Sequence, residues 1–295
     1  MFNSPALEVA IGLIFCFASV ALMASAANEA VAALFGLRAK TLLGGVKQLL
    51  NDPGFDGLAL AVYNHALVHP RGSGTIPAGA SARQIPDPPS YIDAMNFANA
   101  LLECLQQLED RGAALEARLP SLAGRIAGLP DAQLRALLLG MLQRADGDLA
   151  TFQAAIADWF DHGMDRVSGL YKRHAQAITF LLGLLLAAAM NIDAVHLFQA
   201  LWQQPGQIAL IEQLPLADGG PPPDMLASLQ RLQQLPIGRS YFGLDAATLA
   251  ADLFGVLITA SAAMFGAPFW FDLLQGLVQL RSTGPKPDRQ GKSPP

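Results

Sequence analysis

The strongest pattern in this chain is a set of three long apolar windows that contain no charged residue. They run from Val9 to Asn28, from Ala175 to Ile192 and from Leu253 to Phe271. A helix rises about 1.5 Å per residue, so each window is about 27 to 30 Å long, which matches the hydrocarbon core of a bilayer. The pattern therefore predicts three transmembrane helices.

Amphipathic helices are predicted between the first two windows. Apolar residues recur at helical spacing over 95–105 and 134–142, and a further helix begins near Asp148 and continues without proline through the second window. Ser90 is the predicted N-cap of the first of these helices, with Asp93 three residues later as a carboxylate version of the capping box. Because strand-like alternation is absent from the sequence, the predicted fold class is all-α.

These patterns divide the chain into membrane and non-membrane segments. The expected organisation is an N-terminal transmembrane helix in 1–36, a cytoplasmic helical region in 37–174 with a Pro/Gly loop at 70–89, a second transmembrane helix in 175–197, an external loop in 198–245, a third transmembrane helix in 246–280 and a disordered basic tail in 281–295.

The positions of Lys and Arg predict how these helices are oriented. Basic residues follow the first window, precede the second and follow the third, whereas the segment between the second and third windows holds only Arg231 and Arg239. Basic segments tend to stay in the cytoplasm, so the N-terminus is expected outside and the C-terminus inside. One alternative is a signal peptide ending at Ala24-Ser25-Ala26, but the preceding residues include Glu8 and no Lys or Arg.

Composition supports a membrane protein and weakens two other classes. The chain is 52% hydrophobic and only 15% charged, against about a quarter charged in ordinary soluble domains. A net charge of −5 gives no basic excess for a nucleic-acid partner. No phosphate-binding glycine loop, nucleophile elbow or metalloprotease helix occurs, so we expect no catalytic residue, cofactor or metal, and an enzyme is the less favoured class.

A group of polar residues ends the second window. Asn191, Asp193 and His196 fall within two helical turns, and Asp193 and His196 are close enough along a helix to pair. One interpretation is interfacial anchoring or helix packing where the helix leaves the membrane. The alternative is an ion or proton site, since an ionisable residue within a membrane segment is a functional hypothesis by default.

Two further patterns concern packing and metal binding. Small residues recur at packing distance, namely Gly183 and Ala187 in the second window and Gly255, Thr259 and Ala263 in the third. Such rows let membrane helices approach closely, within the chain or between copies in a homo-oligomer. His65 and His69 lie one helical turn apart, but no glutamate lies between them and no third ligand follows, so we expect a structural role.

Four stretches together resemble a family of uncharacterised bacterial inner-membrane proteins. They are "YNHALVHP", "PSYIDAMNFANALLE", "MDRVSGLYKRHAQAITFLLGLLLAAAMNIDAVHLFQALW" and "GAPFWFDLLQGL", and they occur in the family's order. A proline often follows "YNH" and "PSYI" in the family, where this chain has Ala66 and Asp93. The resemblance implies residence in a bacterial inner membrane and supplies no catalytic residues.

The leading functional hypothesis is a non-enzymatic membrane scaffold or anchor that presents a cytoplasmic helical domain. Its expected partners are the lipid bilayer and either further copies of the chain or an unidentified membrane or cytoplasmic protein. The alternative is a small transport or channel component with a polar site near Asp193. A scaffold requires an exposed apolar patch on the 90–170 helices, whereas a transporter requires a continuous polar path.

Overall fold

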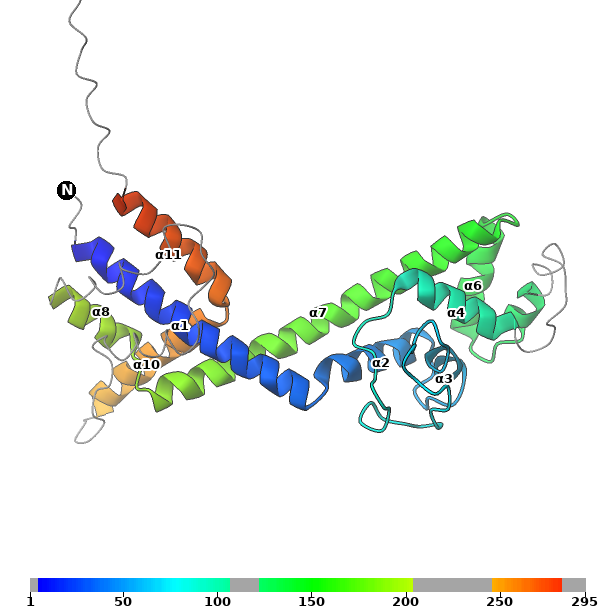
Figure 1. The fold of residues 1–295 in the computed structure, drawn as a ribbon, viewed down its shortest axis with the longest axis horizontal. Coiled ribbons are helices and arrows are strands. Elements are labelled where there is room, and N and C mark those ends of the chain that lie inside the picture. The colour runs from blue at the N-terminus through cyan, green and yellow to red at the C-terminus, as the bar shows by residue number, and fades with distance from the viewer. Residues whose placement is uncertain (1–4, 107–121, 204–245, 283–295) are drawn as a thin grey trace, which may run out of the picture. The chain divides into compact units, whose positions relative to one another are not determined.

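The structure is a computed structural model that describes residues 5–106, 122–203 and 246–282. All regular secondary structure in these ranges is helical (Figure 1), which confirms the all-α prediction. The chain divides into two compact units. We call Met1–Val31 with His174–Pro295 the apolar unit, and Ala32–Arg173 the central unit.

The apolar unit consists of helices that are compatible with a membrane. The N-terminal helix α1 is long and apolar enough to cross a membrane by itself. Two bent helix pairs also meet that criterion when each pair is taken as one span, so one to three spans are compatible with the structure. The helices concerned are α1 (Pro5–Leu34), the pair α7 (Leu149–Ala189) and α8 (Ala194–Gln203), and the pair α10 (Ala246–Ala263) and α11 (Ala267–Ser282).

The predicted second transmembrane segment, 175–197, contains a bend between two helices. α7 ends at Ala189, and α8 follows after a bend of 51°. Asn191 adopts the left-handed conformation at the break, with φ +52°. Asn tolerates this conformation better than most residues, but a helix does not continue through it. Residues 198–203, predicted as loop, belong to α8, and 204–245 lie outside the described residues.

The predicted third transmembrane segment, 246–280, also contains a bend between two helices. The described parts of α10 and α11 are bent by 95° relative to each other. Gly266 has φ +82° at the bend, a conformation that glycine adopts without steric cost. Pro268 follows in the first turn of α11, where its missing N–H removes no hydrogen bond. Of the predicted tail, 283–295 lie outside the described residues.

The apolar unit is apolar both inside and on its surface. Ile11 and Phe15 of α1 are fully buried in a core that also includes Leu197 of α8 and Leu274 of α11. The surface nevertheless exposes more than half of each of Leu181, Leu185, Leu253, Phe254 and Phe265. A helical unit that is apolar all round is typical of a lipid environment.

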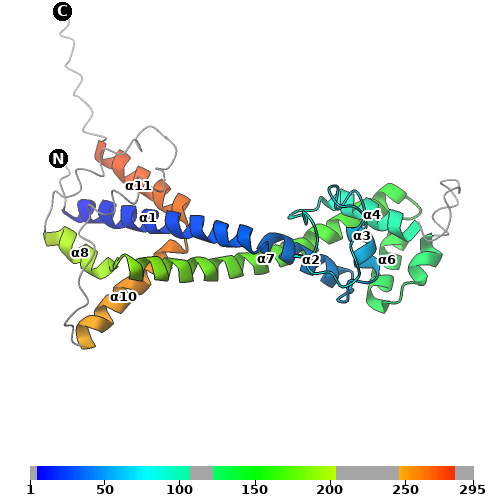
Figure 2. The same cartoon turned by 60° about the horizontal axis from the view of Figure 1, so that its bottom comes forward.

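The helices of the apolar unit pack closely around α10 and α1. α10 crosses the C-terminal part of α7 in both views (Figures 1 and 2) and also packs on α8. α11 lies beside α1, where the Trp270 and Phe17 ring centroids are 5.1 Å apart. The Trp270 indole Nε1–H donates to the Ala262 carbonyl at 2.8 Å, beside the Phe265 N–H that donates to the same oxygen at 3.3 Å, and so ties α11 to the end of α10.

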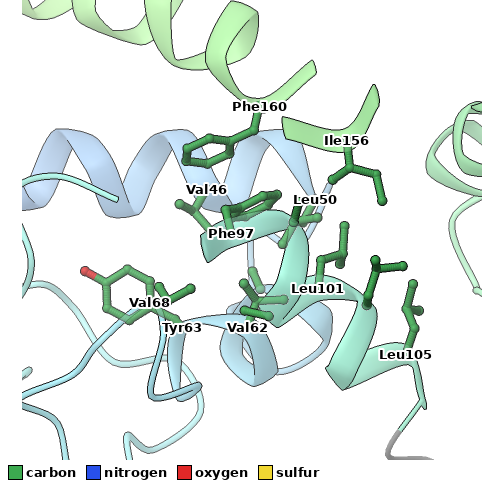
Figure 3. Close-up of a cluster of buried hydrophobic side chains, with 14 of the residues drawn as sticks. Val46, Leu50, Val62, Tyr63, Val68, Phe97, Leu101, Leu105, Ile156 and Phe160 are labelled. Carbon is green, nitrogen blue, oxygen red and sulfur yellow. The ribbon is translucent and has the colours of Figure 1, made fainter. Parts of the chain in front are cut away.

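The central unit has a separate hydrophobic core (Figure 3). Phe97 and Phe160 stack at its centre with ring centroids 4.0 Å apart, and Tyr63 is fully buried beside them. The helices around this core are α2 (Leu37–Leu49), α3 (Leu58–Tyr63), α4 (Ala94–Gln106), α6 (Ala132–Arg144) and the N-terminal part of α7; residues 122–127 are also helical.

Carboxylate side chains cap the N-termini of α4 and α7 in the central unit. The predicted start of α7 is confirmed, because Asp148 accepts the backbone N–H groups of Ala150 and Thr151 at 3.1 Å each. The predicted N-cap of α4 is wrong. Asp93, not Ser90, fills this role, since its Oδ1 accepts the Asn96 N–H at 3.0 Å and α4 begins at Ala94.

Candidate functional site

The polar group at the α7–α8 break is organised around Asp193. Its Oδ1 accepts the backbone N–H groups of Val195 at 2.7 Å and His196 at 3.1 Å, so Asp193 caps the N-terminus of α8. The carboxylate side chain is only 7% exposed and is therefore not a hydrated group at the membrane exit. Among the described residues, no ion pair joins the Asp193 and His196 side chains.

The predicted packing residues of α10 support this break. A Cβ atom at Gly255 would lie 1.6 Å from Asp193 Oδ1, so the carboxylate occupies the space that any side chain at 255 requires. The buried Thr259 hydroxyl lies within hydrogen-bonding distance of two carbonyl oxygens, that of Ile192 at 3.2 Å and that of Gly255 at 3.1 Å. α10 therefore satisfies a backbone acceptor that the helix break has released.

The small residues of α7 lie against the other end of α10. A Cβ atom at Gly183 would be 3.1 Å from the Ala263 Cβ and 3.5 Å from the Ala260 carbonyl oxygen. Ala187 is fully buried in the same apolar core. The structure thus brings these small residues and Asp193 into one interface with α10. The backbones of α7 and α10 approach closely there.

Within the described part of the apolar unit, three carboxylates are buried. Glu8 of α1 is 6% exposed, Asp193 7% and Asp252 of α10 6%. Asp252 precedes Gly255 by three residues, so it lies on the side of α10 that receives the Asp193 carboxylate. Carboxylates are seldom buried this deeply unless they are paired or hydrogen-bonded. For Asp193, the backbone N–H groups of α8 provide these hydrogen bonds.

The two histidines of "HALVH" have different partners and do not converge. His65 Nε2 lies 3.0 Å from Glu103 Oε2 on α4. His69 is buried, and its Nε2 lies 3.0 Å from the Asp87 carbonyl oxygen, which requires Nε2 to carry the proton. Within the part of the chain that the structure describes, no three His, Cys, Asp or Glu side chains are placed to hold a metal ion.

Two pockets flank Tyr91 in the central unit, and the sequence patterns do not reveal them. One, of about 530 Å³, lies between residues 67–71 and 87–96. The other, of about 290 Å³, lies between the start of α2, residues 90–92 and the 160–171 part of α7. Tyr91 lines both pockets and is 74% exposed. We call Tyr91 and the residues that line these two pockets the Tyr91 surface.

The segment that carries Tyr91 is fixed at both ends. The His69 imidazole donates to the Asp87 carbonyl at one end, and Asp93 caps α4 at the other. Between them, Ile92 is buried in the core, so the neighbouring Tyr91 side chain is held outward. Pro88 and Pro89 further restrict the backbone. The tyrosine is therefore presented to the solvent by a constrained segment.

The composition of the Tyr91 surface is typical of a protein-binding site. Leu67, which lines the larger pocket with Tyr91, exposes 38% of its surface, and Met95, four residues after Tyr91 in the sequence, exposes 44%. Arg71 adds a guanidinium, and tyrosine and arginine are the residue types most often found at the energetic centres of interfaces. Tyrosine, methionine and arginine are also enriched at interfaces relative to other surfaces.

Three stretches that are far apart in the sequence meet at this surface. "YNHALVHP" supplies 67–70 to the larger pocket, "PSYI" separates the pockets, and "MDRVSGLYKR" lines the smaller one. Only the folded chain brings these stretches together. Comparison with protein-family models, curated proteins and solved structures finds no match to this chain.

Proposed function

We propose that this protein is a non-enzymatic scaffold of a bacterial inner membrane, and that its central unit binds a partner protein at the Tyr91 surface. The N-terminus is outside, and the central unit and the C-terminus are cytoplasmic. The observation that carries the proposal is an exposed tyrosine on a constrained segment between two pockets. The apolar unit then acts as the membrane anchor, which its exposed leucines and phenylalanines support.

The energetics favour a protein partner over a small polar ligand at this surface. Binding a partner removes about 150 to 250 Å² of tyrosine surface from contact with water, and such aromatic anchors dominate many interfaces. Leu67, which lines the larger pocket with Tyr91, adds further apolar area. Because Asp93 and Asp87 hold the segment in one conformation, little conformational entropy is lost when it binds.

The test places a photo-crosslinking amino acid in the full-length protein expressed in bacterial cells. Replacement at Met95 should give a discrete adduct, whereas replacement at Gln133, an exposed residue of α6, should give none. Adding Tyr91→Ala should remove the Met95 adduct, because it deletes the anchor and leaves the crosslinker in place. An adduct that survives Tyr91→Ala, or equal labelling from Gln133, would contradict the proposal.

A transport or channel role is the second candidate, supported by the buried carboxylates Glu8, Asp193 and Asp252 in the apolar unit. In that role, ionisation of Asp193 is required for flux. Reconstituted vesicles containing wild type or Asp193→Asn distinguish the two functions. We expect no ion or proton flux from either protein, and a wild-type flux that the substitution abolishes would favour transport.

A further inference from the structure

The junction between α1 and α2 exposes two adjacent apolar side chains. Leu34 is 80% exposed and Phe35 is 46% exposed. Gly36, with φ +58°, then turns the chain into α2. Leu34 follows the first apolar window by six residues, or about 9 Å of helix, which is comparable with the headgroup layer of a bilayer. Exposed apolar groups at this position fit a lipid interface.

A cation from a distant loop is held over Phe35. The Arg83 guanidinium carbon lies 5.9 Å from the centroid of the Phe35 ring, within the range of a cation–π contact. Arg83 belongs to a turn closed by three hydrogen bonds between Ser81 and Gln84, of 2.8 to 2.9 Å. The turn therefore presents the guanidinium in a defined position.

The charges around Phe35 complement an anion. Lys40 is exposed and follows Phe35 by five residues, whereas Arg38 lines the smaller pocket beside Tyr91. In the described ranges, no carboxylate forms an ion pair with Arg83. The ring and the fixed guanidinium combine an apolar contact with positive charge, as the surface of an anionic membrane requires.

We infer that Arg83, stacked on Phe35, binds the phosphate of an anionic membrane phospholipid. The planar guanidinium matches a phosphate through two parallel N–H···O bonds, while Leu34 and Phe35 contact the apolar boundary below the headgroups. This inference rests on the proposed membrane residence of α1 and is independent of partner binding at the Tyr91 surface. It identifies a lipid contact formed by the central unit.

Native mass spectrometry of the full-length protein in mild detergent measures how strongly phosphatidylglycerol is retained. Arg83→Gln should weaken retention about fivefold, since one cation near an anionic membrane contributes about 1 kcal/mol. Arg83→Lys keeps the charge but loses the bidentate geometry, so it should give an intermediate value. Arg144→Gln, which removes an exposed cation in the last turn of α6, is the matched control and should retain lipid as wild type does.

Retention unchanged by both Arg83 substitutions would overturn the inference. Equal loss in Arg144→Gln would overturn it as well, because the effect would then come from net charge alone. A thermal melt of each variant verifies that the fold is intact. Membrane residence is tested separately: release of the wild-type protein from membranes by alkaline carbonate would contradict it. Partner binding is tested by the Met95 crosslink.

Discussion

At Gly255, a hydrogen atom in place of a side chain leaves room for the Asp193 carboxylate. The two residues are 62 positions apart, yet a Cβ at 255 would overlap Oδ1. The sequence marked Asp193 as part of a polar group at the end of a long apolar window, interpreted as interfacial anchoring or helix packing, with an ion or proton site as the alternative. Its role as a helix cap was not predicted, since that depends on where α7 ends and on which residue of α10 faces it.

We predict that Gly255→Ala destabilises the protein. The added methyl displaces the Asp193 carboxylate from its position at the start of α8, and overpacking of this kind costs about 1 to 3 kcal/mol. The measurements are membrane abundance and the apparent Tm in detergent. Gly276→Ala is the control, because a Cβ at Gly276 on α11 meets no atom within 4 Å. Equal behaviour of the two variants would refute the close contact.

Asp52 gives a second residue-scale prediction, which concerns pH. Burial raises the pKa of its carboxyl, but hydrogen bonds from the backbone N–H groups of Asp56, Gly57 and Ala59 outweigh this effect and lower it below the ordinary 3.8. A lowered folded-state pKa stabilises the fold above the unfolded-state pKa, and this contribution is lost as pH falls through the folded-state value.

The apparent Tm of the wild-type protein should therefore fall when the pH drops below about 4. Asp52→Asn should lower the Tm at pH 7, because a neutral amide accepts these hydrogen bonds less strongly, by roughly 1 kcal/mol. The variant should also lose part of the acid dependence. Melts between pH 7 and pH 3 provide the measurement, and parallel curves for the two proteins would contradict it.

At the scale of helices, the sequence predicted the apolar segments but not their breaks. Hydropathy reports how much apolar surface a segment carries, and this is the same for a straight and for a bent helix. Each bend depends on one residue in the left-handed conformation, Asn191 or Gly266. The bends are then completed by distant groups, the Thr259 hydroxyl and the Trp270 indole, which local periodicity does not reveal.

The approach of α7 to α10 gives a prediction at this scale. Gly183→Leu should lower the apparent Tm, because a leucine at 183 forces α7 away from Ala260 and Ala263. Ala188→Leu serves as the control, since Ala188 is exposed on the same helix. We expect a loss of about 1 to 3 kcal/mol for Gly183→Leu only. Equal melting of the two variants would argue against this interface.

At the scale of the whole molecule, the candidate site was the least predictable feature. The loop at 70–89 was recognisable from its Pro and Gly content, and the 95–105 helix from its periodicity. The Tyr91 surface arises only when the start of α2, residues 67–71, residues 87–96 and α7 come together. Sequence patterns describe neighbours along the chain, so a surface built by four separated segments is not visible in them.

Topology is the testable property of the whole molecule. A cysteine at Gln133, in a background lacking Cys16 and Cys104, should resist a membrane-impermeant thiol reagent in intact cells and react after permeabilisation. Gln133 is exposed on α6, so folding does not protect it. Burial, with a smaller effect of Glu103, raises the pKa of the Cys104 thiol to about 11. Cys104 is nevertheless removed, so that the cysteine at 133 is the one that the reagent reports. Rapid labelling in intact cells would reverse the proposed orientation.

The division into units also sets an order of events during synthesis. The central unit is contiguous, Ala32–Arg173, whereas the apolar unit requires both the first helix and residues beyond 246. A ribosome adds about 5 to 20 residues per second, so roughly 4 to 15 s separate the completion of the central unit from the start of α10. Small domains commonly fold within such an interval. The Tyr91 surface is thus complete before Gly255, against which the Asp193 carboxylate packs, has been synthesised. Under the proposed function, a nascent chain can recruit its partner before its apolar unit is assembled.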